Sequence, residues 1–408
     1  MEEITNIKIS ELCSKVCSGG TPKSSVPSYY DGNIPWLNTK EINFNRIYST
    51  EKSITEDGLN NSSAKWIDKN AVIVAMYGAT AGKTAISKIP LTTNQACCNL
   101  MIDADKADYR FVYYALVSEY NRLASLANGG AQQNLNAQQI KDFEIPFFSL
   151  KDQKRIANIL STLDDKIELN RRINDNLEQQ AQALFKSWFV DFEPFKDGKF
   201  VESEIGMIPE GWKVGKLEDI ADVVGGGTPS KANALYFDKQ CIPWITPKDL
   251  SIKKTKFISK GEIDITEEGY KNSSAKKIPL GSVLFSSRAP IGYISIAENE
   301  LTTNQGFKSV VPVKAGTSFL YLYLKANTKA IEAQATGSTF KEASGSLMKS
   351  LCVIIPPDTV FDSFERNAFP FFSAQANVER EIVNLSKARD TLLPRLMSGE
   401  LKINDLNC

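Results

Sequence analysis

Hydrophobic side chains recur with a seven-residue period between Ser149 and Phe192, a stretch that contains neither glycine nor proline. They alternate in steps of four and three, and two asparagines belong to the same series. The stripe consists of Ile156, Leu160, Leu163, Ile167, Asn170, Asn174, Leu177, Ala181, Leu184 and Trp188. This pattern predicts one continuous α-helix, roughly 55–60 Å long at about 1.5 Å per residue, that packs along a partner helix.

Local signals mark the start and the register of this helix. Ser149 and Asp152 have the spacing of a capping box, in which the serine oxygen accepts a free backbone N–H and the carboxylate reaches back to the cap. Asn170 and Asn174 are expected to face the partner helix, where a polar residue weakens the contact but fixes its register.

A second heptad stripe, in residues 359–408, supplies the expected partner. Its regular part begins near Phe371 and ends at Leu396, and Ser398-Gly399 is expected to cap the helix. Pro370 is expected to interrupt the helix before that regular part. The residues predicted to pair the two helices are Leu160, Leu163, Ile167, Asn170, Leu177 and Leu184 in the first and Val378, Ile382, Leu385 and Leu392 in the second.

Four short motifs occur twice in the same order, at offsets of about 210 residues, which indicates a duplicated unit. They are Gly19-Gly20-Thr21-Pro22 with Gly226-Gly227-Thr228-Pro229, Ile34-Pro35-Trp36 with Ile242-Pro243-Trp244, Asn61-Ser62-Ser63-Ala64-Lys65 with Asn272-Ser273-Ser274-Ala275-Lys276, and Leu91-Thr92-Thr93-Asn94-Gln95 with Leu301-Thr302-Thr303-Asn304-Gln305. We therefore predict two similar domains at 1–148 and 211–358, followed by long helices at 149–192 and 359–408, with a surface linker at 193–210.

Each predicted domain has short apolar runs separated by Gly, Pro, Asn and Ser, which is typical of strands joined by loops. Examples are Ala71 to Met76 in the first copy and Ser282 to Phe285 in the second. One helix is expected in each copy, near Tyr109–Leu126 and Ser318–Ala335. The predicted fold class is α+β.

The composition of the chain argues against several classes of protein. The chain has 48 basic and 48 acidic residues and no histidine, so His-based triads and the commonest metal ligand are absent. Its seven cysteines form no CxxC pair, which favours reduced thiols in a cytoplasmic protein. A secretory leader and an apolar run of membrane-spanning length are both lacking, so neither secretion nor a membrane partner is expected. These observations disfavour an enzyme.

Two stretches approach catalytic motifs without matching them. Gly78 to Thr84 resembles a phosphate-binding loop, but three residues rather than four separate its glycines, and Tyr293 replaces Lys83 in the second copy. Gly82 and its counterpart Gly292 are therefore interpreted as turn residues. The stretch Ile355-Pro356-Pro357-Asp358 lacks the leading polar residue and the trailing aromatic of the amino-methyltransferase motif.

The run DDKIELNRRINDNLEQQAQALFKSWFVDFEPF at residues 164–195, GMIPEGWKVGKL at 206–217 and RDTLLPRLMSGEL at 389–401 resemble the DNA-specificity subunits of type I restriction–modification enzymes. The resemblance extends over the whole chain. It implies two target-recognition domains held apart by two antiparallel helices, each domain reading one half of a bipartite double-stranded DNA site. The helices would set the unread gap and bind two methyltransferase subunits.

The resemblance also implies further partners and cofactors. Restriction/translocase subunits would join the complex, which acts in phage defence. No cofactor is expected in this chain, and S-adenosylmethionine, ATP and Mg would be bound by the partner subunits. Charge is permissive for DNA: residues 211–358 carry 19 basic against 14 acidic residues, whereas residues 1–149 carry 14 against 15. We therefore expect weak DNA binding by the chain alone.

Candidate DNA contacts are polar loop positions, chiefly those that differ between the copies. Arg288 is the first choice because a guanidinium can bridge guanine O6 and N7, although a salt bridge to a nearby carboxylate is the alternative. The Asn-Gln pairs could contact adenine or could tie loop backbone together. The candidates are Lys23, Ser24, Lys40, Thr80, Lys83, Asn94, Gln95, Gln132, Gln133 and Asn134 in the first copy and Lys231, Lys248, Ser286, Ser287, Arg288, Asn304, Gln305, Ser338, Thr339 and Lys341 in the second.

Two function classes follow from the sequence. The leading hypothesis is a non-catalytic subunit that directs adenine N6 methylation by its partners. The alternative is a coiled-coil scaffold that carries two recognition modules for another ligand.

Overall fold

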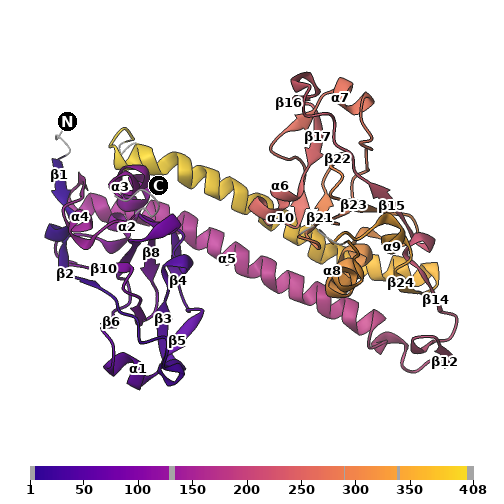
Figure 1. Cartoon of the computed structure of the whole chain (residues 1–408), viewed down its shortest axis with the longest axis horizontal. Coiled ribbons are helices and arrows are strands. Elements are labelled where there is room, and N and C mark those ends of the chain that lie inside the picture. Colours follow the sequence, from indigo (N-terminus) through magenta and orange to yellow (C-terminus); the bar gives the residue numbers. More distant parts are fainter. Residues whose placement is uncertain (1–4, 128–133, 289, 338–340, 402–408) are drawn as a thin grey trace. The chain divides into compact units, whose positions relative to one another are not determined.

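The computed structural model describes residues 5–127, 134–288, 290–337 and 341–401 (Figure 1). Its contacts divide the chain into two compact units, Met1–Ile167 with Asn384–Cys408 and Glu168–Val383. The helices α5 (Leu150–Phe189) and α10 (Asp358–Met397) each have 40 residues, and each contributes to both units. Each unit therefore contains one globular domain and a segment of each long helix.

The first domain is built on two mixed sheets. A five-stranded sheet has the order β2 (Cys13–Ser18), β10 (Cys97–Ile102), β7 (Val72–Ala75), β8 (Thr84–Ser87) and β4 (Asn45–Ile47). A four-stranded sheet has the order β5 (Lys52–Ile54), β3 (Tyr30–Leu37), β9 (Leu91–Thr93) and β6 (Trp66–Ile67), and β1 (Thr5–Lys8) pairs with β11 (Glu144–Phe147). The ladders are antiparallel except β4 with β8 and β3 with β9.

The second domain has a closely similar order. Its five-stranded sheet runs β15 (Ala221–Gly225), β23 (Lys308–Pro312), β20 (Val283–Phe285), β21 (Ile294–Ala297) and β18 (Phe257–Ile258). Its four-stranded sheet runs β16 (Phe237–Asp238), β19 (Asp264–Ile265), β17 (Ile242–Ile245) and β22 (Thr302–Thr303), and β14 (Lys213–Lys216) pairs with β24 (Cys352–Ile355). Again the last strand of the larger sheet is parallel to its neighbour. The matching order confirms the duplication.

Further helices complete both domains. The first contains α1 (Glu56–Asn60), α2 (Tyr109–Ser118), α3 (Tyr120–Ser125) and α4 (Ala137–Lys141). The second contains α6 (Pro247–Lys253), α7 (Glu267–Lys271), α8 (Thr317–Gln334) and α9 (Gly345–Lys349). The single helix expected near residues 109–126 is thus two helices, whereas the one expected near residues 318–335 is a single helix. The mixture of helices and sheets confirms the α+β class.

The repeated motifs meet one another inside each domain. The Trp36 indole N–H donates to the Gly20 carbonyl oxygen at 2.9 Å, and that of Trp244 donates to the Gly227 carbonyl oxygen at 3.0 Å. A Cβ atom on Gly20 would lie 2.2 Å from the backbone nitrogen of Ala64, so only glycine fits this approach. The repeats are therefore scaffold positions, and this explains why both copies retain them.

Within each unit, α5 and α10 run antiparallel. In the second unit the Asn170 amide donates to the Glu381 carboxylate at 2.9 Å, and the Gln375 amide donates to the Asn174 carbonyl oxygen at 3.2 Å. In the first unit Arg389 donates to the Asp164 carboxylate at 2.8 Å. Partner numbers fall on one helix as they rise on the other, which confirms the antiparallel pairing and shows that Asn170 faces the partner helix.

The residues predicted to pair the helices are all buried or half-buried. Leu160, Ile167 and Asn170 are buried. Leu163, Leu177, Leu184, Val378, Ile382, Leu385 and Leu392 are half-buried. In the first unit, Ile156 and Leu160 share a core with Leu393 and Leu396. The predicted positions are thus buried or half-buried on both helices, and their pairing residue by residue stays a prediction.

The expected interruption at Pro370 was wrong. The helix α10 passes through Pro370 without a break, and its buried stripe begins at Phe361 rather than near Phe371. Pro370 is exposed, so the carbonyl group left without an N–H partner faces water. Phe364, Ala368 and Phe372 are buried on both sides of the proline and hold the helix in place.

The segment expected to be a linker, residues 193–210, contains regular structure. The strands β12 (Phe200–Ser203) and β13 (Gly206–Pro209) form an antiparallel hairpin. Ile208 and Trp212 are buried in the core of the second unit. The turn needs a glycine, since Gly206 has a φ of +108°.

Candidate nucleic-acid interface

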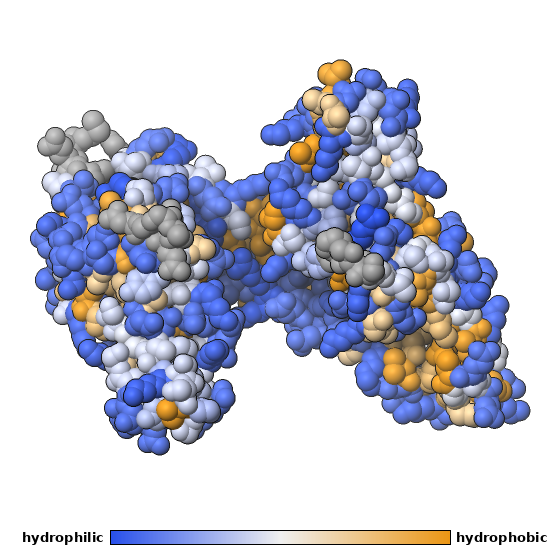
Figure 2. Space-filling model, viewed as in Figure 1, coloured by the Kyte–Doolittle hydropathy of each residue, from blue (hydrophilic) through white to orange (hydrophobic). Residues whose placement is uncertain are grey.

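In each domain the Gly-Gly-Thr-Pro loop contacts the Asn-Gln loop. The Thr21 hydroxyl donates to the Gln95 side-chain oxygen, and Thr228 makes the same bond to Gln305. Both glutamines are exposed, as are Lys23, Ser24 and Lys231 on the adjoining loops. In the second domain this region forms a cleft lined in part by Lys231, Trp244, Lys248, Asn304 and Gln305. The face seen in Figure 2 is mostly hydrophilic over both domains, as a surface that meets phosphates would be.

The asparagines of these pairs bind their own loops. The side-chain oxygen of Asn94 accepts the Ala96 N–H at 3.2 Å, and that of Asn304 accepts the Gly306 N–H at 2.9 Å. Asn94 is buried and Asn304 half-buried. The geometry therefore favours the backbone-tying interpretation for both asparagines and leaves the exposed Gln95 and Gln305 available to a ligand.

Ser286 and Ser287 are fully buried, so their hydroxyl groups do not reach the surface. Ser286 accepts the Tyr293 N–H at 2.7 Å and donates to the Pro290 carbonyl oxygen at 2.8 Å, and Ser287 donates to the Gly306 carbonyl oxygen at 3.2 Å. The sequence predicted DNA contacts here because these positions are polar and differ between copies. Their hydrogen bonds instead shape the loop that presents Arg288.

Arg288 itself is exposed and takes part in an ion pair. Its Nε donates to the Glu342 carboxylate at 3.1 Å, and Lys308 lies 3.2 Å from the other oxygen of that carboxylate. The two cations lower the pKa of Glu342 even though partial burial opposes this. The salt bridge named as the alternative is thus present, and 49% of the Arg288 side chain remains exposed to a ligand.

The resemblance of residues 78–84 to a phosphate-binding loop does not extend to the backbone. Gly78–Thr80 form one 3₁₀ turn, and the strand β8 follows where a phosphate-binding loop is followed by a helix. Gly78 and Gly82 have φ values of +68° and +82°, which confirms Gly82 as a turn residue. Thr80 donates to the Tyr77 carbonyl oxygen and Lys83 to Asn43 at 2.8 Å, so both lie on a loop surface rather than around a phosphate.

Comparison with known proteins identifies the family. The model described as "Type I restriction modification DNA specificity domain" matches residues 1–179 and 209–360. The MjaIX specificity subunit of Methanocaldococcus jannaschii is 31% identical, over 98% of this chain and 94% of its own. The HindI specificity subunit of Haemophilus influenzae is 26% identical, over 90% and 94%.

The chain belongs to the type I restriction–modification DNA specificity family.

A solved structure supports the same architecture for this specificity subunit. The S subunit of the type I restriction–modification system from M. genitalium aligns over 97% of both chains with a TM-score of 0.65 and 18% identity. A specificity subunit is the non-catalytic component of its complex. Within the described ranges, no helix of the specificity subunit is long and apolar enough to cross a membrane.

The remaining candidates in the specificity subunit fall into two groups. Lys40 and Lys248 are exposed and form ion pairs with Glu51 at 2.9 Å and Glu262 at 2.7 Å, and Asn134 and Lys341 are exposed. Gln132, Gln133, Ser338 and Thr339 lie outside the described residues.

Sequence reasoning missed the polar residues that attach each domain to the helices. In the first unit the Tyr114 hydroxyl donates to Asp164 at 2.6 Å, and Arg46 binds Asp165. In the second unit Lys256 and Lys325 both bind Glu178. Charged residues beside a heptad stripe are usual on solvated helices, so these residues gave no signal in the sequence. Gln375, which accepts a hydrogen bond from Lys256, is a polar residue within the stripe itself, and that position was a signal.

Proposed function

We propose that this specificity subunit reads a bipartite double-stranded DNA target, with one half-site for each domain. The observation that carries the proposal is the pair of domains with the same strand order in the larger sheet and the same internal motifs but different loop side chains. Gln95 and Gln305 are shared, whereas Lys83 in the first copy corresponds to Tyr293 in the second, and Arg288 belongs to the second alone. Shared scaffolds with unlike loops are what two different half-sites require.

The long helices would set the unread gap between the half-sites and dock two methyltransferase subunits, which restriction/translocase subunits would join. In this proposal the partners bring S-adenosylmethionine, ATP and Mg, and the complex works in the cytoplasm, where its DNA substrate is. The nearly balanced charge of the first domain fits a subunit that binds DNA weakly alone and needs partner cations around the duplex.

A domain replacement tests the proposal. Residues 211–358 are replaced by the equivalent domain of a relative, the chimera is assembled with its methyltransferase subunits, and methylated sites are mapped. One half-site should change while the other half-site and the gap stay constant. The wild-type complex is the control. A chimera in which both half-sites change, or neither does, would show that the domains do not read separately.

Binding is tested on the same complexes. A gel shift with random and selected duplexes, with the methyltransferase subunit present, should give a clear preference for the selected duplex. Equal affinity for both would favour a scaffold that binds some other ligand.

A further inference from the structure

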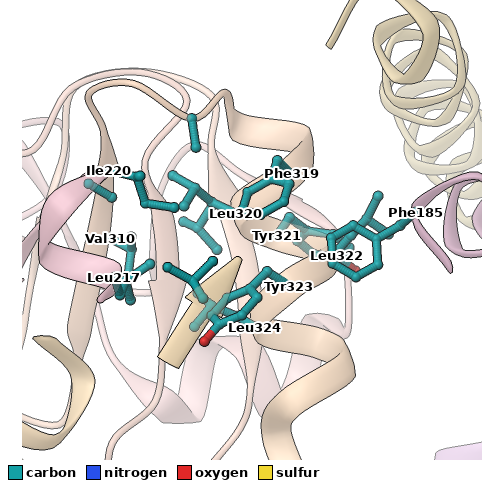
Figure 3. Packing of buried hydrophobic residues seen from close by; sticks show 14 of the residues in the cluster. Phe185, Leu217, Ile220, Val310, Phe319, Leu320, Tyr321, Leu322, Tyr323 and Leu324 are labelled. Carbon is teal, nitrogen blue, oxygen red and sulfur yellow. The ribbon is translucent and has the colours of Figure 1, made fainter. Parts of the chain in front are cut away.

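Two of the places where the second domain contacts its helix pair differ in chemistry. The first is an aromatic cluster around Phe319 of α8. The Phe319 ring centroid lies 4.8 Å from that of Phe189 on α5 and 4.9 Å from that of Phe361 on α10. Figure 3 shows buried residues of α8 between the core of the domain and Phe185 of α5, whose ring centroid lies 5.5 Å from that of Phe319. Such packing is strong but weakly directional. Beside it, the Ser318 hydroxyl donates to the Glu365 carboxylate of α10 at 2.8 Å, so the start of α8 is held on α10.

The second place is polar and centres on Lys256, the residue before β18. Its ammonium group donates to the Glu178 carboxylate of α5 at 2.9 Å and to the Gln375 side-chain oxygen of α10 at 2.7 Å. The Glu379 carboxylate of α10 accepts the backbone N–H groups of Lys256 and Phe257 at 2.9 and 3.2 Å. One edge of the larger sheet is therefore bonded to both helices.

The ammonium group of Lys256 is buried, so its position relative to the helices is narrowly defined. Only 4% of its side chain is exposed, and its nitrogen lies 3.3 Å from the centroid of the Phe372 ring and 4.2 Å from that of Tyr321. Burial lowers the pKa of Lys256, Glu178 opposes this, and the result is about 8. Burial raises the pKa of Glu178, but Lys256 and Lys325 lower it further, to about 2. Both groups are thus charged at neutral pH, and a buried charge pair tolerates little misalignment.

We propose that Lys256 is a positioning residue that fixes the orientation of the second domain on α5 and α10. It thereby fixes the half-site spacing that the subunit accepts. The inference rests on the proposed function, because spacing has a meaning only for a bipartite target. Lys256 faces the helices, because its ammonium group bonds to Glu178 of α5 and to Gln375 of α10. It acts through the domain and touches no DNA.

Lys256 contributes a directional contact to the attachment of the second domain. Without Lys256 the domain keeps the aromatic cluster and the bond from Ser318 to Glu365, so it stays attached at α8. The bonds from the amides of residues 256 and 257 to Glu379 can then open. The domain loses its buried bond to α5 and can rotate about α8. Rotation moves the reading loops as one body, so each loop keeps its side chains and its base preference. Spacing should therefore loosen while the half-sites remain the same.

The first test compares Lys256→Met with Lys325→Met. Methionine keeps an unbranched chain beside the rings of Phe372 and Tyr321 and removes the ammonium group with its hydrogen bonds, and Glu178 retains Lys325. Lys325 binds the same carboxylate but is 40% exposed, so Lys325→Met is the matched control. Each complex methylates a set of duplexes that share both half-sites and differ in spacer length.

The expected result is a loss of roughly tenfold in discrimination between adjacent spacer lengths for Lys256→Met, the size of one charge-assisted hydrogen bond, and a change within about twofold for Lys325→Met. Both half-sites should be unchanged. Wild-type discrimination in Lys256→Met, or equal losses in both variants, would overturn the inference.

A second variant and a direct readout guard against a folding defect. Glu178→Gln reaches the same contact from the helix side and should give the same loss of discrimination as Lys256→Met. In hydrogen exchange, both should expose the amides of residues 256–258 while α8 stays protected. Unchanged exchange at residues 256–258 would contradict a rotation of the domain about α8. A wild-type complex that methylates no bipartite site would refute the proposed function instead, since the exchange result does not depend on methylation.

Discussion

The ion pair of Arg288 and its proposed contact with a base need not exclude each other. Its guanidinium lies 3.1 Å from Glu342 and is half exposed. An exposed ion pair contributes about 0–1 kcal/mol, whereas a bidentate contact with guanine contributes about 1–3 kcal/mol to discrimination. The carboxylate can therefore hold Arg288 in an extended pose until DNA arrives. The ion pair is then compatible with base reading.

Two substitutions separate these roles. Arg288→Gln should relax the second half-site at one base pair, by a factor of about 5–150, because the bidentate donor is lost. Glu342→Gln removes only the carboxylate charge and should leave the target unchanged. Methylation mapping of both complexes checks this. An unchanged second half-site in Arg288→Gln would assign Arg288 to the scaffold.

The lowered pKa of Glu178 predicts how acid changes the stability of the second unit. Its folded-state pKa of about 2 lies below the ordinary 4.5, so its contribution to the free energy of unfolding is complete above pH 4.5 and is lost as the pH falls toward 2. At neutral pH the contribution is about 3 kcal/mol. Urea unfolding of the wild type and of Glu178→Gln should therefore differ most at neutral pH and converge in acid. A difference that stays constant with pH would be inconsistent with this assignment.

The helix α10 shows that packing can carry a helix through a proline. Phe361, Phe364, Ala368 and Phe372 are buried at helical spacing on both sides of Pro370. The lost hydrogen bond lies on the exposed face, where water replaces it. The aromatic contacts outweigh the cost of one exposed proline.

Pro370→Ala should consequently stabilise the subunit. Alanine restores the N–H group and is favoured over proline in a helix interior by about 3 kcal/mol, less about 0.4–1 kcal/mol for the freer unfolded chain. We expect a net gain of about 2 kcal/mol, measured by urea unfolding. Equal stability of the variant and the wild type would mean that the local backbone is already relaxed around the proline.

The inner stripe of the paired helices can be tested with one matched pair of residues. Leu163 lies on the predicted stripe of α5, and Leu169 on the same helix is 51% exposed. Leu163→Asp, like Leu385→Asp on α10, should destabilise the pairing by several kcal/mol, because a carboxylate in an apolar contact must pair or protonate. Leu169→Asp should stay within about 0.5 kcal/mol. Circular dichroism and methyltransferase association check this. Normal results for all three variants would show that the helices do not pair in this way.

Each compact unit holds one domain together with its own segments of α5 and α10. The unit boundaries fall between Ile167 and Glu168 on α5 and between Val383 and Asn384 on α10. The bonds from Tyr114 to Asp164 and from Lys256 to Glu178 lie inside their own units. An insertion at both boundaries should therefore leave every domain contact in place.

Inserting one heptad at each boundary should lengthen the gap alone. Seven residues keep the stripe in phase and add roughly 10 Å, which corresponds to about three base pairs. Methylation mapping should return the same two half-sites with a longer spacer. An insertion in α5 alone is the control, and it should disrupt pairing. A changed half-site in the double insertion would show that reading and spacing are coupled.

The sequence by itself determined the periodic and repeated features of this protein. Heptads at Leu160 and Ile382, and duplicated motifs around Trp36 and Trp244, are local patterns, so helix pairing and the two-domain plan could be read directly. Burial and partner choice depend on residues that are distant in the sequence. Only the tertiary structure therefore decided that Ser286 is buried, that Pro370 lies within a helix and that Lys256 joins β18 to both helices.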